Sequence, residues 1–451
     1  MNNNILKIRS LSRFIIETET PLMISSGDKG ILTDSFIVTD TNDLPFISGT
    51  SLCGVLKHFL EETEVLSKNE ANDIFGVQLK SKSVDSHGSN IIFSDAKLVL
   101  EDGNIAEGVM NLPNSEYYTY FRNLPIRQHA KINDRGATIK GGKFDNQVVY
   151  KGTRLCFEME MLSSDSGYAE EYFNKILSAL HNNSIRIGGG VYNGFGAIKV
   201  VECRSAILDL TIKENLSSYL TMTSSLNDMA FWNNYNNVEI EAQDSTKWEK
   251  YTVELSPDDF FYFGSGFGDD DVDMTPMSED VVVWDANKPR FMKENILIPA
   301  TSIKGALSHR VAYHYNRLRG WFNEDTAKVY SANEAVKELF GGGDEDKLCR
   351  GNVIISDIIV EKECEDKIFN HVKIDYFTGG AIDGALFSEK ATYMPGAKFI
   401  LEILVRKEAF NEEKVKESFE AAIGDLCDGL LPLGGAVNRG HGVFTGKILN
   451  A

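Results

Sequence analysis

Several features that mark other protein classes are missing from this sequence. No uninterrupted apolar run is long enough to span a bilayer, and the first residues lack the apolar core of a signal peptide. The six cysteines are scattered, without a Cys-x-x-Cys pair, which argues against a zinc site and against a disulfide framework. We therefore expect a cytoplasmic protein with reduced thiols and no membrane association.

A net positive charge is also absent, because 66 acidic residues outweigh 46 basic residues and give a formal charge of −20. This balance argues against a free-standing nucleic-acid binder, since phosphate contacts need cations. Residues 122–154 reverse it locally, with eight basic and two acidic side chains. By itself such a stretch is most simply interpreted as a solvated hairpin. The length of 451 residues and the charged fraction of 25% are typical of a globular protein with two or three domains.

Four landmarks occur twice, in the same order and about 250 residues apart. The first is a Thr-Ser pair that starts an amphipathic helix, with Ser51 and Ser302 as the expected N-cap residues. The second is a Phe-Gly followed by a strand that ends in Ser-Asp, at Asp95 and Asp357. The third and fourth are a Lys-Ile segment with a Gly-rich hairpin, and a Gly-rich turn near the end of each copy.

This repeat predicts two homologous domains in tandem, at residues 1–205 and 248–451, joined by an Asn- and Ser-rich linker at residues 206–247. Within each copy, short alternating strands are interleaved with two helices, which include residues 169–180 and 412–426. The pattern favours an antiparallel-rich α+β fold of the split β-α-β kind.

The order of the motifs resembles the RAMP superfamily, which supplies the backbone subunits of type III CRISPR effector complexes. It runs from an acidic Gly loop and a Pro-x-x-Ser/Thr-Ser-x-x-Gly helix start to a Phe-Gly…Ser-Asp strand, a Gly-rich hairpin and a Gly-Gly…Asn-x-Gly-x-Gly turn. Two such units in one chain resemble the tandem-fused subunits of subtype III-D. The resemblance implies two RRM-like, ferredoxin-type domains. It also implies guide RNA, target RNA and other type III effector subunits as partners.

The resemblance further implies a thumb-like hairpin between guide and target bases, and the basic stretch lies where this thumb is expected. Cationic side chains there would contact phosphates, which hold register without reading sequence. The two helix starts offer free N–H groups and a positive dipole end to phosphate. The predicted RNA contacts are Ser51, Lys57, Arg122, Arg127, His129, Lys131, Arg135, Lys140, Lys143, Asn193, Ser302, Lys304, Arg310, Lys373, Arg439 and His441.

Target-RNA cleavage in this family uses an aspartate in the loop before the Pro-x-x-Ser/Thr-Ser turn, and Asp34 matches that position in the first unit. A carboxylate can hold a hard divalent cation, with Mg²⁺ as the expected ion. The cation neutralises charge on the phosphate while the ribose 2′-OH attacks, which leaves a 2′,3′-cyclic phosphate. Outside this family, an aspartate so placed is most simply a turn-capping residue.

The second unit departs from the pattern, because its loop is longer and richer in acidic residues. Counting back from the strand-end residues Asp40 and Asp285 places Glu279 opposite Asp34, with Asp280 one residue later. Asp273 is a further candidate if the loop folds back. The acidic residues 269–271 lack EF-hand spacing and are interpreted as a solvated loop.

Three other functions stay open from the sequence. The chain could be a non-catalytic scaffold of the same complex. It could be a stand-alone guide-processing endoribonuclease, for which only His129 and His441 are suitably placed. It could also be a metal-binding or nucleotide-handling α+β protein outside CRISPR systems.

Overall fold

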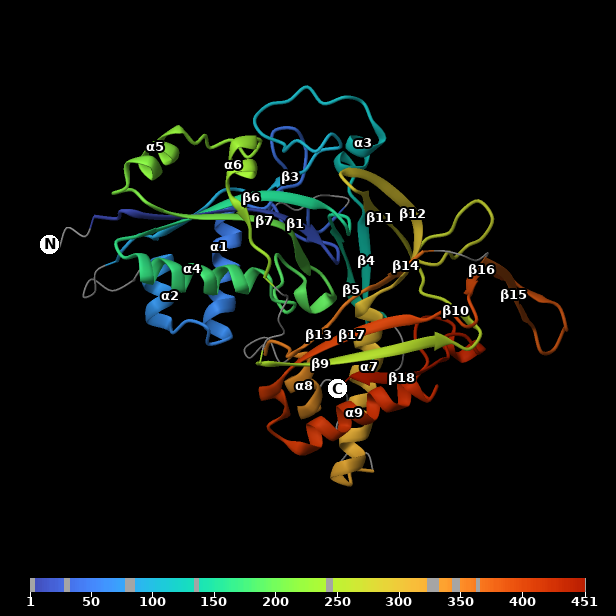
Figure 1. Cartoon of the computed structure of the whole chain (residues 1–451). Helices are drawn as coiled ribbons and strands as arrows, with labels where there is room; N and C mark the ends of the chain where they lie inside the picture. The colour runs from blue at the N-terminus through green and yellow to red at the C-terminus, as the bar shows by residue number, and fades with distance from the viewer. Residues whose placement is uncertain are drawn as a thin grey trace.

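Two α+β units follow one another along the chain in the computed structural model (Figure 1). The structure describes residues 5–450 apart from the internal segments 28–32, 78–85, 134–137, 241–245, 323–331, 343–348 and 362–365. The predicted fold class, α+β with antiparallel sheets, is confirmed.

The first unit is built on an antiparallel sheet with the strand order β2-β6-β1-β7. Leu52, Leu56 and Leu60 recur every four residues along the first helix, so they share one face and are buried against this sheet. In chain order the elements are β1 (Ile8–Thr18), α1 (Gly49–Glu62), α2 (Lys68–Phe75), β2 (Ile91–Phe93), β3 (Lys97–Leu98), α3 (Glu116–Arg122), β4 (Ile126–Ile132), β5 (Thr138–Gln147), β6 (Arg154–Ser163), α4 (Ser166–Leu180), the 3₁₀ turn η1 (Val191–Asn193) and β7 (Ile198–Asp209).

The second unit repeats this plan with the strand order β13-β17-β9-β18. Its elements are β9 (Trp248–Pro257), β10 (Phe260–Phe261), β11 (Ser278–Asp285), β12 (Lys288–Ile298), α7 (Ala300–Arg319), α8 (Glu334–Phe340), β13 (Val353–Ile355), β14 (Ile358–Val360), β15 (Asp366–Ile374), β16 (Ala381–Tyr393), β17 (Phe399–Arg406), η3 (Lys407–Phe410), α9 (Glu413–Cys427), η4 (Val437–Arg439) and β18 (Phe444–Asn450).

Both units therefore have the same topology. Numbered within a unit, the four main strands lie in the order 2-3-1-4, with a long helix after the first and the third. This is the split β-α-β arrangement of ferredoxin-type domains. In each unit the two long helices cover the same face of the sheet and enclose its main core (Figure 1). None of the helices described combines the length and the apolar character needed to cross a membrane.

An aspartate at the end of a neighbouring strand caps the first long helix of each unit. Asp95 Oδ1 accepts a hydrogen bond from Gly49 N at 2.9 Å, and Asp357 Oδ1 accepts one from Ala300 N at 2.7 Å. The Ser-Asp strand end and the Thr-Ser helix start are separate motifs in the sequence. In the fold the two motifs are in contact, because the carboxylate accepts a hydrogen bond from an N–H group that the helix itself leaves unpaired.

The N-cap residues differ from those predicted. Ser48 is the N-cap of α1, and its hydroxyl accepts the Ser51 N–H at 3.3 Å. Pro299 precedes α7 and supplies no side-chain cap. Ser51 and Ser302 therefore lie inside the first turn of their helices, because each helix begins earlier than its Thr-Ser pair suggests.

Residues 206–247, which were predicted as a linker, include the end of β7, α5 (Lys213–Thr221), α6 (Met229–Asn234) and β8 (Asn236–Asn237). The helices α5 and α6 lie on the face of the first sheet opposite α1 and α4 (Figure 1). Leu11, Leu208 and Phe231 are buried there. The domain boundaries stay a prediction, but the described part of this segment up to residue 240 packs on the first unit.

Candidate nucleic-acid interface

Strands β4 and β5 form an antiparallel hairpin at the position expected for the thumb. Lys131, Lys140 and Lys143 are exposed on it, and none of them makes an ion pair with a described residue. Arg122 is exposed at the end of α3, just before the hairpin. Because these cations form no ion pair within the described part of the chain, they can contact phosphate. The predicted contact Arg135 lies outside the described residues.

Arg127, at the base of the same hairpin, is not available to RNA. Its guanidinium donates to Glu279 and, at 2.5 Å, to Asp357 Oδ2, and these three side chains are 7%, 4% and 1% exposed. Burial alone would lower the pKa of Arg127, but the attraction of the two carboxylates outweighs it and raises the pKa. The prediction of an RNA contact is therefore corrected: Arg127 joins the two units.

Replacing Arg127 with methionine should lower the free energy of unfolding by about 3 kcal/mol, because two buried carboxylates would lose their cation. Denaturant unfolding of the full-length chain, followed by fluorescence, measures this. Arg122→Met is the matched control, since its side chain is exposed, and we expect it to change the free energy by less than about 0.5 kcal/mol. Equal effects of the two substitutions would contradict a structural role for Arg127.

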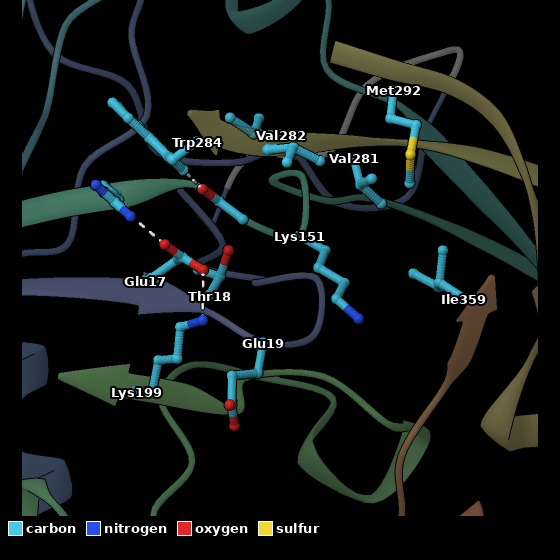
Figure 2. A pocket seen from close by; sticks show the side chains of 13 residues that line it. Glu17, Thr18, Glu19, Lys151, Lys199, Val281, Val282, Trp284, Met292 and Ile359 are labelled. Atoms are coloured by element: carbon cyan, nitrogen blue, oxygen red, sulfur yellow. Dashed lines mark hydrogen bonds and ion pairs between the residues drawn. The ribbon is translucent and has the colours of Figure 1, made fainter. Parts of the chain in front are cut away.

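A cavity of about 480 Å³ lies next to this ion cluster, between the end of β1 and strand β11 (Figure 2). The two units are tied together at its wall, where Val282 N donates to Lys151 O at 2.9 Å and Trp284 Nε1 donates to Gly152 O at 2.7 Å. Figure 2 shows the Lys151 side chain extending into the cavity, and burial lowers the pKa of its ammonium group. The joint between the units is therefore polar and partly hollow.

The Gly-rich turn of the first unit packs against the start of α7. A Cβ atom on Gly194 would lie 2.6 Å from the Cβ atom of Ala300, so this turn needs glycine for the two units to approach. The predicted contact Lys304 donates to Tyr192 O at 3.1 Å, and burial lowers its pKa to about 8. Asn193 lies in the same turn and is partly buried. Lys304 therefore faces the joint between the units.

Two further predicted contacts have internal partners. Lys57 Nζ donates to Asn72 Oδ1 and to Gly76 O, both at 2.9 Å, and so holds the end of α2 against α1. Arg310 pairs with Asp425 and links α7 to α9. In these conformations their charges are neutralised or satisfied within the unit, and they offer little to a phosphate.

The remaining predicted contacts lie on or near the hairpin of the second unit. Lys373 is exposed on β15. Arg439 pairs at 3.0 Å with the buried carboxylate of Glu389, which His371 Nε2 also contacts at 3.0 Å. His441 is 8% exposed and lies among aromatic rings. Of these three residues, Lys373 is exposed and forms no ion pair with a described residue.

The hairpins of the two units are structurally equivalent. His129 pairs with Phe144 across β4 and β5, and His371 pairs with Phe387 across β15 and β16, in each case with ring centroids 4.8 Å apart. Burial and the nearby charge of Arg127 lower the pKa of His129, which therefore stays neutral and serves as packing. This equivalence confirms that the hairpin belongs to the repeated unit.

The tip of the second hairpin was not singled out from the sequence. Tyr376 and Phe377 are 93% and 91% exposed there. The sequence does contain a signal for this tip, namely two adjacent aromatic residues shortly before a Gly-Gly pair in a polar hairpin. Exposed aromatic rings of this kind can stack on unpaired bases.

Asp34 lies at the base of the first hairpin and is exposed. It forms a reciprocal pair with Asp145 on β5: Asp34 N donates to Asp145 Oδ1 at 2.8 Å, and Asp145 N donates to Asp34 Oδ2 at 3.1 Å. Two backbone groups thus position the two carboxylates beside each other, with one oxygen of each outside the reciprocal bonds.

In the second unit Asp273, and not Glu279 or Asp280, holds the place of Asp34. Ser388 N donates to Asp273 Oδ2 at 2.8 Å, and Asp273 N donates to Ser388 Oγ at 3.1 Å. Ser388 directly follows Phe387, just as Asp145 follows Phe144. The bridge between Gly264 and Pro276 also matches the bridge between Ser25 and Ile37, and places Asp273 where Asp34 lies.

The predicted alignment failed because a hairpin is longer in the second unit. In the first unit Thr39 and Pro45 pair across a short turn, whereas β11 and β12 occupy this place in the second. The added residues lie between Asp273 and α7, so Asp285 has no equivalent position in the first unit. Glu279 is buried against Arg127, and Asp280 Oδ1 accepts the Glu294 N–H at 2.8 Å.

The carboxylates of Asp34 and Asp145 fit the magnesium ion that the resemblance implies. Mg²⁺ is commonly held by one or two carboxylates and keeps several of its waters. Asp34 Oδ1 and Asp145 Oδ2 remain outside the reciprocal hydrogen bonds and are the oxygens available to it. Within the described ranges, no group of three or more His, Cys, Asp or Glu side chains is arranged to hold a metal.

Comparison with known proteins gave one family. A family model described as RAMP superfamily matches residues 15–199 and matches again at residues 261–445. The two matches together cover more than half of the chain, and each contains the two long helices of its unit and the hairpin at the thumb position. Parts of each sheet lie outside the matches, including all of β9. A search of curated proteins found no match.

Proposed function

This chain belongs to the RAMP superfamily, and on that basis we propose that it is an RNA-binding backbone subunit of a type III CRISPR ribonucleoprotein that cuts guide-paired target RNA. The presence of two units in one chain supports an arrangement like that of subtype III-D. The partners are guide RNA, target RNA and other subunits of the effector complex. The predominantly acidic remainder of the chain is consistent with protein neighbours more than with additional RNA.

The observation that carries this proposal is the same pair of features in both units. Each unit has a hairpin that projects from the sheet, and each places one aspartate against the backbone of that hairpin. Such a carboxylate has a defined position relative to any RNA that follows the hairpin. A repeated site also predicts two cuts in the target, separated by the spacing of the two units.

The residues of the first unit have separate tasks. Lys131, Lys140 and Lys143 contact phosphates and hold the RNA in register. Asp34, with Asp145 beside it, places negative charge at the scissile position and would hold the magnesium ion. A bound Mg²⁺ neutralises charge that develops on the phosphate during attack by the ribose 2′-OH. The products carry a 2′,3′-cyclic phosphate and a 5′-hydroxyl.

Removal of divalent metal should stop target cleavage and leave guide binding intact. The test uses the purified complex with a labelled guide-matched RNA, with EDTA or with excess Mg²⁺, and maps product ends on a gel. Guide retention in the same samples is the control, because phosphate contacts by lysine need no metal. Cleavage at an unchanged rate in EDTA would contradict the assigned role of the metal.

A further inference from the structure

A second cavity, of about 350 Å³, lies between the two units on the side of α1. The first unit contributes one face of α1 and the segment from Ser184 to Tyr192, and the second contributes parts of β9, β13 and the end of β17. Among the described residues, three arginines line the cavity, namely Arg186, Arg350 and Arg406, together with one carboxylate, that of Glu62. The described lining therefore has more basic than acidic side chains, although Arg406 also pairs at 3.6 Å with Glu408 outside it.

Arg186 is held by backbone carbonyl groups. Its guanidinium donates to the backbone carbonyls of Asn183 at 2.6 Å and Ile185 at 2.9 Å, and it makes no ion pair with a described residue. Burial lowers the pKa of Arg186, yet arginine keeps its charge in proteins. Arg186 is partly buried, and Glu19 and Glu402 attract it without forming an ion pair. Its remaining N–H groups can therefore donate to a bound anion.

The other two arginines share Glu62 and are oriented by aromatic rings. Arg406 pairs with Glu62 and lies 4.8 Å from the centroid of the Trp248 ring, while its buried Nε has no hydrogen-bond partner. Arg350 lies 3.8 Å from Glu62 and 5.1 Å from the centroid of the Tyr192 ring. These contacts with rings and carboxylates orient the two guanidinium groups, whose remaining N–H groups can donate to an anion.

We propose that this cavity binds a phosphate group of a nucleotide, carried either by a free nucleotide or by an RNA strand. Its volume is within the range of small-ligand sites. Guanidinium groups bind phosphate bidentately, and Arg186 supplies the charge that Glu62 does not neutralise. Because both units contribute arginines, the bound phosphate stabilises their relative position. The inference does not depend on cleavage by Asp34.

The experiment uses the full-length chain with Asp34 intact and measures binding by calorimetry. The probes are inorganic phosphate, AMP, ATP and a short single-stranded RNA. Arg186→Gln should weaken binding by about tenfold or more, as expected for loss of one charge-assisted contact. The matched control is Arg204→Gln, which removes an arginine of β7 that already pairs with Glu202 at 2.8 Å and lies outside the cavity. It should leave the affinity unchanged.

The probes separate the two sources of phosphate. If Arg186→Gln weakens the binding of AMP or ATP, the ligand is a free nucleotide. If Arg186→Gln weakens the binding of RNA but not of the nucleotides, the ligand is an RNA strand. Arg350→Gln is a second cavity variant. Because the Arg350 side chain is half exposed, its replacement should not impair folding, and the test remains valid even if Arg186→Gln fails to fold. The proposal is overturned if none of the probes binds, or if both cavity variants bind as tightly as the unaltered protein.

Discussion

Replacing Asp34 with alanine should slow cleavage at one position of the target by about 10³-fold, and should leave guide binding unchanged. The substitution removes the carboxylate that the Asp145 N–H holds in place, together with the negative charge that a metal needs. The measurement is a time course with the purified complex and an end-labelled target, in which each product is quantified separately.

Two controls separate chemistry from structure in this experiment. Asp34→Asn keeps an acceptor for the Asp145 N–H but removes the charge, so it should be as inactive as alanine. Asp102→Ala removes an exposed aspartate from a loop outside the hairpin and should cut normally. If the Asp34→Ala complex still cut the target at every position, the chain would be a non-catalytic scaffold. Cutting of precursor repeat RNA by the isolated chain would instead indicate a guide-processing enzyme.

Replacing Asp273 with alanine should abolish the second cut to a similar extent, about 10³-fold, while the cut assigned to Asp34 continues. The reason is structural equivalence, because Asp145 N donates to Asp34 and Ser388 N, at the equivalent hairpin position, donates to Asp273. The same end-labelled target reports both positions at once, so each variant serves as the internal control of the other.

The competing assignment from the sequence is tested with Asp280→Ala. Asp280 accepts a backbone N–H at the edge of β11 and β12, so its loss should leave both cuts in place. If Asp280→Ala removed the second cut and Asp273→Ala did not, Asp280 and not Asp273 would be the counterpart of Asp34. A single cut that only Asp34 controls would mean that the second unit binds RNA without cleaving it.

The superfamily prediction needed only the sequence, and the family match confirms it. Helix starts, Phe-Gly ends and Gly-rich turns are local signals, because each depends on a few neighbouring residues and their backbone preferences. Their recurrence in one order was therefore enough to predict two tandem α+β units. The exposed lysines of the first hairpin follow from local composition in the same way.

Burial and pairing between distant residues were decided by the tertiary structure. Arg127 looked like its basic neighbours in the sequence, but Glu279 and Asp357 reach it from the other unit. Asp273 matches Asp34 because it is hydrogen-bonded to Ser388 on β16, as Asp34 is to Asp145 on β5. A residue count misses this match, because the β11–β12 hairpin is longer than the corresponding turn of the first unit.

The sequence by itself thus determined the repeat, the fold class and the family, because these depend on order and local chemistry. Only the fold decided which charges are free, which are neutralised in the joint, and where two arginine-bearing surfaces enclose a cavity. Each of these depends on desolvation and on contacts between residues far apart in the chain.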